Sequence, residues 1–278
     1  MNVICPVCMH HCELEEGRAG LCRARENQGG RSVAVNYGRL TALALDPVEK
    51  KPLGRFMPGS MILSAGSFGC NLRCPFCQNH EISMAGEETA DMGSSISLMP
   101  EELAARAYAL ADRGNIGVAF TYNEPLVGWE YVRDTARQVR GLGMKNVIVT
   151  NGSVTDLVLD EILPLTDAMN IDLKGFGDGY YRWLGGDLGT VKHFISRACK
   201  ACHVELTTLI VPGRNDSEEE MEALAAWVAS LDREIPLHVT RFFPRYKMAG
   251  ARPTPVDTVY RLAEVAAAKL QYVYTGNC

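Results

Sequence analysis

The stretch "GCNLRCPFCQNHEIS" (residues 69–83) decides how the rest of the chain is interpreted. It puts three cysteines, Cys70, Cys74 and Cys77, within eight residues of one short segment. Structural zinc usually takes four protein ligands, and a four-iron cluster likewise has one ligand position on each iron. Three thiolates would therefore leave one iron of such a cluster open to a small chelating molecule. The alternative is a zinc site that a nearby side chain such as His80 completes.

The composition of the chain is that of an ordinary globular protein. Its 278 residues are enough for one large α/β domain or two smaller ones, and 47% of them are hydrophobic while 22% are charged. The formal net charge of −5 argues against a general nucleic-acid footprint. No apolar run approaches the ~18 residues of a membrane span, and the N-terminus lacks the basic and apolar regions of a signal peptide. We therefore expect a cytoplasmic monomer that binds neither membranes nor nucleic acids.

Seven of the ten cysteines fall into two groups, which indicates metal ligation because disulfides are rare in the cytoplasm. The second group consists of Cys5, Cys8, Cys12 and Cys22, spaced C-x2-C-x3-C-x9-C. Four thiolates make a closed zinc site, with His10 or His11 as spare ligands. A second iron–sulfur cluster is the rival interpretation, and reduced free thiols are the third. We interpret Cys199 and Cys202 as packed cysteines, since a free thiol behaves as a small hydrophobe.

The chain divides into a small cysteine-rich N-terminal region, residues 1–58, and a main domain, residues 59–278. After the four cysteines, the segment 31–45 alternates around Tyr37-Gly38 in the manner of a hairpin. A connector rich in proline, glycine and lysine follows, "DPVEKKPLGRFMPGS" (46–60). So small a region buries little core by itself, so a bound metal would help to hold it together.

From residue 60 onward, short apolar runs alternate with amphipathic helical stretches. The predicted strands are 61–66, 116–122, 145–150, 167–173, 203–211 and 235–242, with 272–276 as a candidate for a terminal strand. Six strands separated by helices predict parallel βαβ units. We therefore expect an α/β fold, a partial, open TIM-like β/α barrel of about six βα units. A doubly wound sheet is the structural alternative.

Two of the helices carry clear start and stop signals. One has Pro100 near its first position, acids in its first turn and Gly114 as a C-cap. The other starts at Asp216 or Ser217 and has three glutamates in its first turn, where negative charges interact favourably with the helix dipole.

Polar side chains gather where the predicted strands end. In a β/α barrel the chemistry lies at the carboxyl ends of the strands. The first strand leads into the three-cysteine segment, and the later strand ends carry Glu124, Asn151, Asp172, Lys174, His238 and Arg241. A core alone would not require this clustering of thiols, carboxylates and cations on one rim.

The three-cysteine segment and several later segments resemble those of a known family. The motif "CNLRCPFC", with Phe76 directly before the third cysteine, is similar to the C-x3-C-x2-C motif of radical S-adenosylmethionine (SAM) enzymes. The segments "AFTYNEPLVGWEY", "VTNG", "NIDLKGF" and "LHVTRFFP" resemble, in this order, parts of the pyruvate formate-lyase activating enzyme group. The N-terminal cysteine pattern and residues 36–60 resemble more narrowly the AmmeMemoRadiSam-type subgroup. The similarity covers nearly the whole chain.

The resemblance implies a 4Fe-4S cluster on Cys70, Cys74 and Cys77, whose open iron chelates S-adenosyl-L-methionine. One electron from the cluster then splits SAM into methionine and a 5′-deoxyadenosyl radical, which abstracts a hydrogen atom. By the same resemblance, the partners are a reducing protein such as flavodoxin or ferredoxin and a protein substrate. The leading hypothesis is an oxidoreductase that acts as a glycyl-radical activase or descends from one.

The resemblance also implies roles for single residues. Glu124 would face the methionine ammonium group and Lys174 the methionine carboxylate. Asn151 and Asp172 would bind ribose hydroxyls or the methionine moiety, and His238 would lie near the nucleoside. Each role has a plain alternative: Asn151 in a turn, Asp172 and Lys174 as a structural ion pair, and His238 as a core histidine.

The chain departs from the activating enzymes at two positions. It has Val149 where they have aspartate, and Asn170 where they have methionine. These positions help to form a monovalent-cation site in the relatives. Because the aspartate is missing, the resemblance does not carry that cation site over to this chain.

Two other functions remain open from the sequence. One keeps the radical chemistry but directs it at a small molecule or at another kind of protein residue. The other is a metal-binding module without catalysis, which would have no need of Glu124, Lys174 and His238 on one rim.

Overall fold

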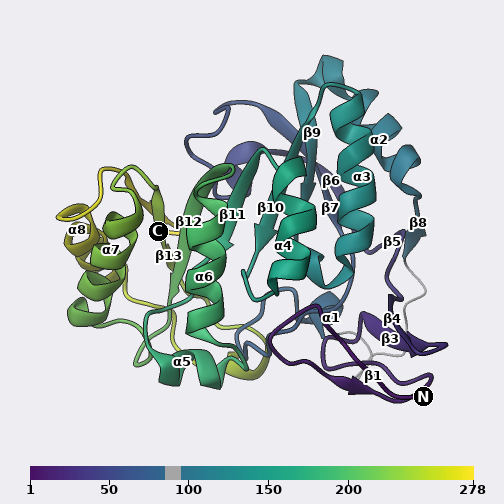
Figure 1. The fold of residues 1–278 in the computed structure, drawn as a ribbon. Coiled ribbons are helices and arrows are strands. Elements are labelled where there is room, and N and C mark those ends of the chain that lie inside the picture. The colour runs from purple at the N-terminus through teal and green to yellow at the C-terminus, as the bar shows by residue number, and fades with distance from the viewer. Residues whose placement is uncertain (85–94) are drawn as a thin grey trace.

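The computed structural model describes residues 1–84 and 95–278, and its centre is one eight-stranded sheet (Figure 1). The order along the sheet is β14-β13-β12-β11-β10-β9-β7-β6. Its strands are β6 (Ala42–Pro47), β7 (Met61–Gly66), β9 (Asn115–Phe120), β10 (Lys145–Thr150), β11 (Ala168–Asp172), β12 (His203–Ile210), β13 (Leu237–Arg241) and β14 (Val273–Gly276). β6 pairs antiparallel with β7, whereas the other neighbours pair parallel.

Six helical connections join the seven parallel strands, as parallel neighbours require. The helices are α1 (His80–Ser83), α2 (Pro100–Tyr108), α3 (Trp129–Gly141), α4 (Asp156–Ile162), α5 (Asp178–Trp183), α6 (Leu188–Ala198), α7 (Glu218–Leu231) and α8 (Val256–Ala267). Short 3-10 turns are η1 (Val48–Lys50), η2 (Ala111–Arg113), η3 (Pro125–Gly128), η4 (Leu163–Leu165) and η5 (Tyr246–Met248). Figure 1 shows α2, α3, α4 and α6 on one side of the sheet. The predicted open β/α barrel of six βα units is thereby confirmed.

The predicted elements agree closely with the structure. Each predicted strand, including the terminal one, ends within two residues of the observed bounds. Ser217 caps α7, and its Oγ accepts the backbone N–H of Glu220 at 3.2 Å. The helix that begins at Pro100 already ends at Tyr108, and Gly114, with φ 81°, ends the following turn η2 instead.

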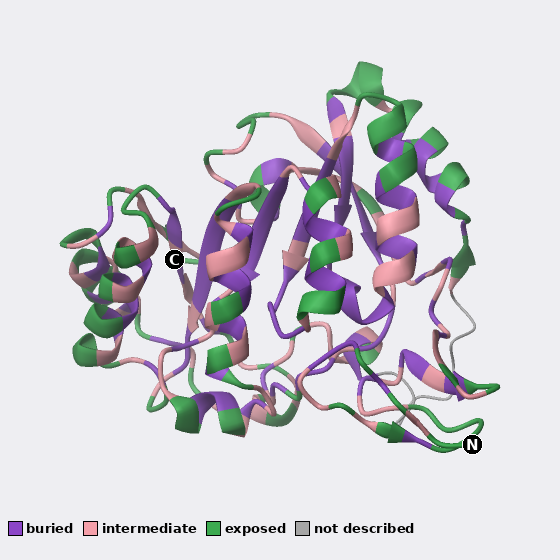
Figure 2. Ribbon diagram, viewed as in Figure 1, coloured by how far each residue is buried: buried purple, intermediate pink, exposed green. Residues whose placement is uncertain are grey.

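The two faces of the sheet have different coverings, as the alternation of side chains along a strand requires. Leu63, Val118 and Ile148 belong to the core beneath the helices. Ile62 faces the other way and packs in a smaller cluster with Leu53. That cluster also contains Val48, Ala119, Val147 and Ala168. The connector after β6 therefore fills the inner face of the barrel, while Figure 2 shows buried strands beneath helices with exposed outer sides.

The N-terminal region contains short strands, and its hairpin differs from the prediction. The small strands are β1 (Val3–Ile4), β2 (Glu13–Leu14), β3 (Arg25–Gln28), β4 (Arg31–Ala34), β5 (Arg39–Leu40) and β8 (Ile96–Ser97). The hairpin predicted around Tyr37-Gly38 is wrong, because β5 pairs with β8 and β6 with β7. The hairpin instead joins β3 and β4 through Gly29 and Gly30, both at positive φ, which suits a two-residue turn.

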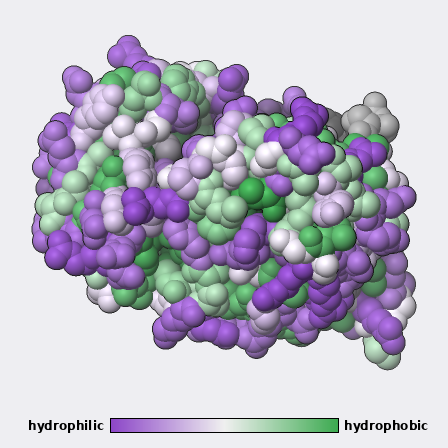
Figure 3. Space-filling model, turned by 90° about the horizontal axis from the view of Figure 1, so that it is seen from above, coloured by the Kyte–Doolittle hydropathy of each residue, from purple (hydrophilic) through white to green (hydrophobic). Residues whose placement is uncertain are grey.

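The division between residues 1–58 and 59–278 stays a prediction. β6 precedes the proposed boundary but pairs with β7 in the main sheet, so the two regions share one sheet. Seen from above, hydrophilic residues cover much of the surface and hydrophobic residues form smaller patches between them (Figure 3). Within the described part of the chain, no helix is both long and apolar enough to cross a membrane.

Candidate functional site

The three-cysteine segment follows β7 at the carboxyl end of the sheet and is held on both sides. The N–H of Glu124 donates to the carbonyl of Gly69 at 3.2 Å, and the N–H of Arg73 donates to the carbonyl of Leu184 at 2.8 Å. Leu72, Cys74 and Phe76 pack in one buried cluster. The other buried members of that cluster are Tyr180, Leu184, Val211 and Phe242. The loop is therefore fixed by packing and backbone hydrogen bonds, although it has almost no regular structure of its own.

Burial favours the protonated form of two of these thiols, Cys70 and Cys74. It raises the pKa of Cys70 well above the ordinary thiol value, and the charge of Glu124 adds to this effect. Burial also raises the pKa of Cys74 to about 11. Without metal the two groups are neutral thiols near pH 7, and metal binding must displace their protons.

Glu124 is 2% exposed and accepts three hydrogen bonds, two from the end of β10 and one from its own turn η3. Its Oε1 accepts the hydroxyl of Thr150 at 2.8 Å and the N–H of Leu126 at 3.0 Å, while Oε2 accepts the N–H of Asn151 at 2.7 Å. Burial raises the pKa of Glu124 to about 7, although these three hydrogen bonds oppose the shift. The carboxylate thus fixes the loop after β10 and retains acceptor capacity on Oε2.

Asn151 links that loop to the cysteines. Its Nδ2 donates to Asn71 Oδ1 at 2.9 Å and lies 3.7 Å from Cys70 Sγ. Asn71 in turn donates to the carbonyl of Ser153 at 2.7 Å. Gly152 has φ 67°, so the predicted Asn-Gly turn is present, and the asparagine side chain also reaches the thiol segment. The turn and the site contact coexist at Asn151.

Asp172 and Lys174 form an ion pair just beyond β11. Lys174 Nζ donates to Asp172 Oδ2 at 2.9 Å. Burial alone would lower the pKa of Lys174, but the charges of Asp172 and Cys74 raise it well above the ordinary value. Asp172 stays about one-third exposed, so the pair is open to a ligand on that side. The predicted cofactor roles of both residues remain predictions.

His238 lies on the inner face of the barrel against a buried carboxylate. Its Nε2 is 2.6 Å from Glu205 Oε2, and its ring stacks on Tyr274. The sheet register aligns His238 with Thr207 of β12, which in turn aligns with Asp172 of β11. Two strand spacings of ~4.8 Å separate these backbones, so His238 and Asp172 share one level of the barrel. The predicted nucleoside contact of His238 stays a prediction.

Glu205 is a residue that the sequence analysis did not identify. It is fully buried, and its two oxygens accept four donors. Oε1 accepts the N–H of Arg55 at 2.7 Å and faces His203 Nε2 at 3.0 Å, and Oε2 accepts the N–H of Gly54 at 2.9 Å besides facing His238. A glutamate within the apolar strand "HVELTTLIV" was the available signal, because a buried carboxylate requires partners.

A second unidentified group contains Lys51, whose side chain is only 3% exposed. Lys51 Nζ donates to Asp46 Oδ2 at 3.0 Å, and the Tyr122 hydroxyl donates to the same oxygen at 2.8 Å. Burial lowers the pKa of Lys51, and Asp46 only partly opposes this. Tyr122 has φ 75°, an unusual backbone for a bulky residue. Asn79, just beyond the thiol segment, donates to the Tyr122 carbonyl at 2.7 Å.

Asn170, one of the two positions noted in the sequence analysis, has both ends of its side-chain amide hydrogen-bonded. Its Nδ2 donates to the carbonyl of Pro52 at 2.8 Å, and its Oδ1 accepts the hydroxyl of Thr207 at 3.0 Å. The side chain therefore ties the connector to the inner face of the sheet, and its amide groups are already in use.

The N-terminal cysteines pack against this rim. The backbone of Cys8 pairs with that of Val154 in an isolated antiparallel β-bridge, and His10 Nε2 is 2.8 Å from the carbonyl of Asn71. Burial raises the pKa of Cys8 to about 12, and the nearby thiols of Cys22, Cys5 and Cys12 add to the shift. The fold thus brings the two cysteine groups together, although 47 residues separate Cys22 from Cys70.

Neither group converges on one metal ion. In the described residues, no three or more histidine, cysteine, aspartate or glutamate side chains are grouped so that they could hold a single ion. His80, considered as a fourth ligand, stacks on Tyr246 at 4.5 Å between ring centroids, and its buried Nδ1 has no hydrogen-bond partner among the described residues. A single zinc ion shared by Cys70, Cys74, Cys77 and His80 therefore has no support in this arrangement.

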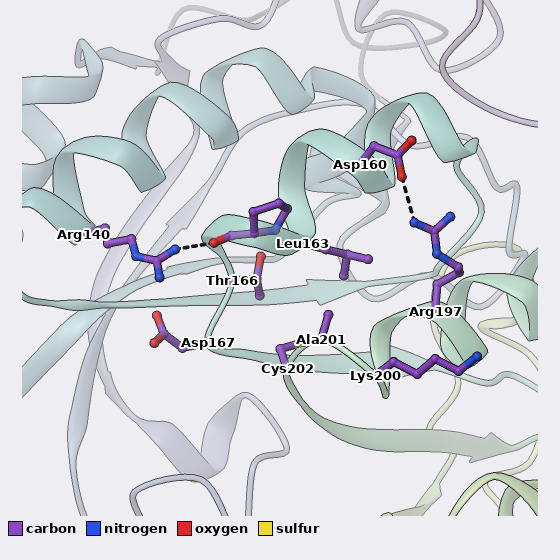
Figure 4. A pocket seen from close by; sticks show the side chains of 10 residues that line it. Arg140, Asp160, Leu163, Thr166, Asp167, Arg197, Lys200, Ala201 and Cys202 are labelled. Carbon is purple, nitrogen blue, oxygen red and sulfur yellow. Dashed lines mark hydrogen bonds and ion pairs between the residues drawn. The ribbon is translucent and has the colours of Figure 1, made fainter.

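A hollow of about 660 Å³ lies away from this rim, near the start of β11 and β12 (Figure 4). Its charged side chains are largely paired. Arg197 donates to Asp156 at 2.9 Å and to Asp160 at 2.8 Å, and Arg140 donates to the carbonyl of Pro164. Cys202 lines it too, with its Sγ 3.7 Å from the carbonyl of Ala198. The hollow holds none of the predicted site residues.

Comparison with known sequences identifies the family. The sequence profile described as "Radical SAM superfamily" matches residues 66–228, more than half of the chain. An uncharacterized protein from Methanocaldococcus jannaschii is 40% identical over 99% of this chain and 81% of its own length. The pyruvate formate-lyase 1-activating enzyme of Escherichia coli K12 is 27% identical over 70% of this chain and 83% of its own length.

Solved structures with the same fold agree with this assignment. Streptococcus suis SuiB has a TM-score of 0.59 at 15% identity, covering 77% of this chain and 48% of its own. A radical SAM methyltransferase from Sphaerobacter thermophilus has a TM-score of 0.55 at 18% identity, covering 79% and 67%. A domain of a pyruvate-formate lyase-activating enzyme from Bacteroides vulgatus has a TM-score of 0.50 at 19% identity, covering 58% and 99%. The thiol loop, the open β/α barrel and the matched profile together place the chain in the radical SAM superfamily.

Proposed function

We propose that this chain is a glycyl-radical activase-like enzyme that cleaves SAM reductively and directs the resulting radical at a glycine of a partner protein. The observation that carries the proposal is the joining of Cys70, Glu124 and Asn151 into one hydrogen-bonded rim. The 27% identity with the pyruvate formate-lyase 1-activating enzyme of E. coli supports the choice of an activase.

The residues present fit the group that the superfamily implies. Each iron of a 4Fe-4S cluster takes one cysteine, so its thiolates need not converge on one point. Cys70, Cys74 and Cys77 offer three soft donors on one packed loop, in a cluster otherwise lined by apolar side chains. When bound, the cluster and SAM supply a 5′-deoxyadenosyl radical that abstracts hydrogen.

The remaining residues bind, orient and shield. Glu124, already holding the loop after β10, can accept one further donor, which suits the ammonium group of SAM. Lys174 offers the complementary charge for a carboxylate, with Asp172 orienting its Nζ. Asn151 stands beside Cys70, where an amide can bind the methionine moiety or a ribose hydroxyl. The packed loop buries Cys74 and leaves Cys70 and Cys77 half-buried, so a bound group would be partly shielded from water, as a reactive radical requires.

A one-electron donor protein such as flavodoxin or ferredoxin would reduce the enzyme, and cytoplasmic location would give access to it. Structural zinc at the N-terminal cysteines has no support in the thiol arrangement described above.

The test is an anaerobic assay of the reconstituted protein with SAM and a chemical reductant. We expect equal amounts of methionine and 5′-deoxyadenosine, and loss of both when Cys70, Cys74 and Cys77 are replaced by alanine. Cys199→Ala is the matched control, since Cys199 packs against the helical core far from the loop in sequence. An intact cluster that leaves SAM uncleaved would refute the proposal. Electron paramagnetic resonance with a glycyl-radical enzyme as substrate then tests the activase role.

A second target class is a small molecule or another kind of protein residue. The observation that favours it is Asn170, whose amide is committed to Pro52 and Thr207, so the cation position of the activating enzymes is altered here. If SAM is cleaved but no glycyl radical forms on any tested partner, this alternative replaces the activase.

A further inference from the structure

The four N-terminal cysteines form one buried group. The β1–β2 hairpin brings Cys5 and Cys12 together, and the N–H of Cys5 donates to the carbonyl of Cys12 at 2.9 Å. A methyl group added to Gly20, two residues before Cys22, would lie 3.6 Å from Cys12 Sγ. Cys5, Cys8 and Cys22 are each at most 7% exposed. We call Cys5, Cys8, Cys12 and Cys22 the N-terminal thiol group.

This group resembles the radical-site cysteines in its chemistry. Both sets contain soft sulfur donors that are buried or half-buried. A structural zinc ion needs four sulfurs at ~2.3 Å from a single centre. An iron–sulfur cluster distributes its thiolates over separate irons, so its ligands stand farther apart. Thiolates suit both metals, but zinc carries no electrons, so the position of this group beside the radical-site loop decides between them.

We propose that the N-terminal thiol group ligates a second iron–sulfur cluster with four cysteine ligands, next to the radical-generating one. Four thiolates complete the ligand set of a 4Fe-4S cluster, so this one would have no open iron. It could not chelate SAM and would serve electron transfer or stability instead.

The contacts between the two groups favour electron transfer. A side chain at Gly69, directly before Cys70, would meet the carbonyl oxygen of Cys22 at 2.6 Å. Met9 packs against the cluster of Leu72, Cys74 and Phe76, and His10 contacts the carbonyl of Asn71 at 2.8 Å. The backbone of Cys22 therefore lies directly against the backbone that precedes Cys70. A cluster needed only to staple the N-terminal region would not require this position.

The proposed step moves one electron and breaks no bond. A one-electron donor protein of the flavodoxin or ferredoxin class is oxidised, the second cluster is reduced and then reoxidised, and the first cluster receives the electron. The N-terminal region would thus be the site at which the enzyme accepts electrons from its donor protein.

Metal analysis tests the site directly. We expect about eight irons and eight sulfides per anaerobically reconstituted chain, with no zinc, because each 4Fe-4S cluster holds about four. Replacing the N-terminal thiol group by alanine should leave about four irons. The Cys199→Ala/Cys202→Ala double variant is the matched control and should keep about eight. One zinc per chain, or an iron content that N-terminal substitution leaves unchanged, would overturn the proposal.

A second measurement covers the case in which the N-terminal variant does not fold. Replacing Cys70, Cys74 and Cys77 by alanine leaves the N-terminal thiol group intact, and Mössbauer spectroscopy of that protein should still show a cluster with four cysteine ligands. Its absence would sink the proposal, whatever the wild-type enzyme does with SAM. For the electron-entry role, a folded N-terminal variant should be reduced normally by dithionite but at least tenfold more slowly by flavodoxin. Equal slowing with both reductants would contradict that role.

Discussion

Glu205 holds His238 from inside the barrel, with 2.6 Å between Glu205 Oε2 and His238 Nε2. The same carboxylate accepts the backbone N–H groups of Gly54 and Arg55, so the connector after β6 and the strand β13 depend on one buried charge. Each imidazole that faces this carboxylate must point an N–H at it, because a bare nitrogen lone pair would repel the oxygen. In the neutral form this assigns the proton of His238 to Nε2 and leaves Nδ1 as an acceptor.

This arrangement predicts a pH-dependent contribution of Glu205 to stability. Burial alone would raise the pKa of Glu205, but hydrogen bonds from His203, His238 and the connector backbone lower it from 4.5 to about 2. A depressed carboxyl pKa stabilises the fold above the unfolded pKa, and the benefit is lost as the pH falls from about 4.5 toward 2. At pH 7, Glu205→Gln should therefore cost up to about 3 kcal/mol of unfolding free energy.

Unfolding of both proteins at a series of pH values measures this difference. The gap between wild type and Glu205→Gln should be full at pH 7 and should shrink below pH 4.5. Glu49→Gln is the control, since Glu49 is an exposed carboxylate of the same connector that accepts the N–H of Gly59. A gap that stays constant down to pH 3 would show that the charge of Glu205 is not what stabilises the fold.

The lysine pair of the connector gives a second stability prediction. Lys50 and Lys51 both donate to Asp46, but Lys50 is 66% exposed and Lys51 only 3%. Replacing Lys51 leaves the largely buried Asp46 with only the exposed Lys50 and the Tyr122 hydroxyl as partners. Breaking such a buried ion pair costs about 3 kcal/mol, whereas an exposed pair contributes about 0.5 kcal/mol. Chemical denaturation should therefore show a large loss for Lys51→Met and almost none for Lys50→Met. Equal losses would mean that burial does not distinguish the two lysines.

The sequence predicts the strand segments and the polar residues at their ends because both depend on local patterns. Apolar runs of six residues, such as 61–66 and 145–150, mark the strands, and parallel strands place their carboxyl ends together. Glu205 and Lys51 could not be predicted, because their partners lie far away in the chain: Glu205 binds Gly54 across 151 residues. The wrong hairpin has a similar cause, since the alternation in residues 31–45 does not say which strand each segment pairs with.

Glu124 allows the cofactor role to be separated from the structural one. Glu124→Gln should weaken SAM binding by about ten- to a hundredfold, because a charge-assisted hydrogen bond contributes roughly 1.5–3 kcal/mol. Thr150→Val is the matched control: it removes one donor to Glu124 Oε1 but keeps the carboxylate charge. Titration of the cluster's absorbance or paramagnetic signal with SAM measures both variants.

The two outcomes for Glu124 are distinct. If Glu124→Gln and Thr150→Val weaken SAM binding equally while the cluster assembles normally, the residue acts by fixing the loop at Asn151 and not through its charge. If neither variant changes SAM binding, Glu124 has no part in the cofactor site.

Gly69 tests the contact between the two cysteine groups without touching a thiol. It has φ 90°, and an added methyl group would lie 2.6 Å from the Cys22 carbonyl oxygen and 2.7 Å from Ala24 Cβ. Because the obstacle is backbone, Gly69→Ala must displace the N-terminal region from the loop before Cys70. Gly17→Ala is the matched control: Gly17 also has positive φ, 70°, but an added methyl group there meets no atom within 4 Å. Backbone strain alone costs on the order of 1–2 kcal/mol at either position, so both variants should lose that much stability. Only Gly69→Ala should also increase proteolysis of residues 1–30 and slow reduction by flavodoxin. Matching behaviour of the two variants would show that contact with the loop before Cys70 does not hold the N-terminal region in place.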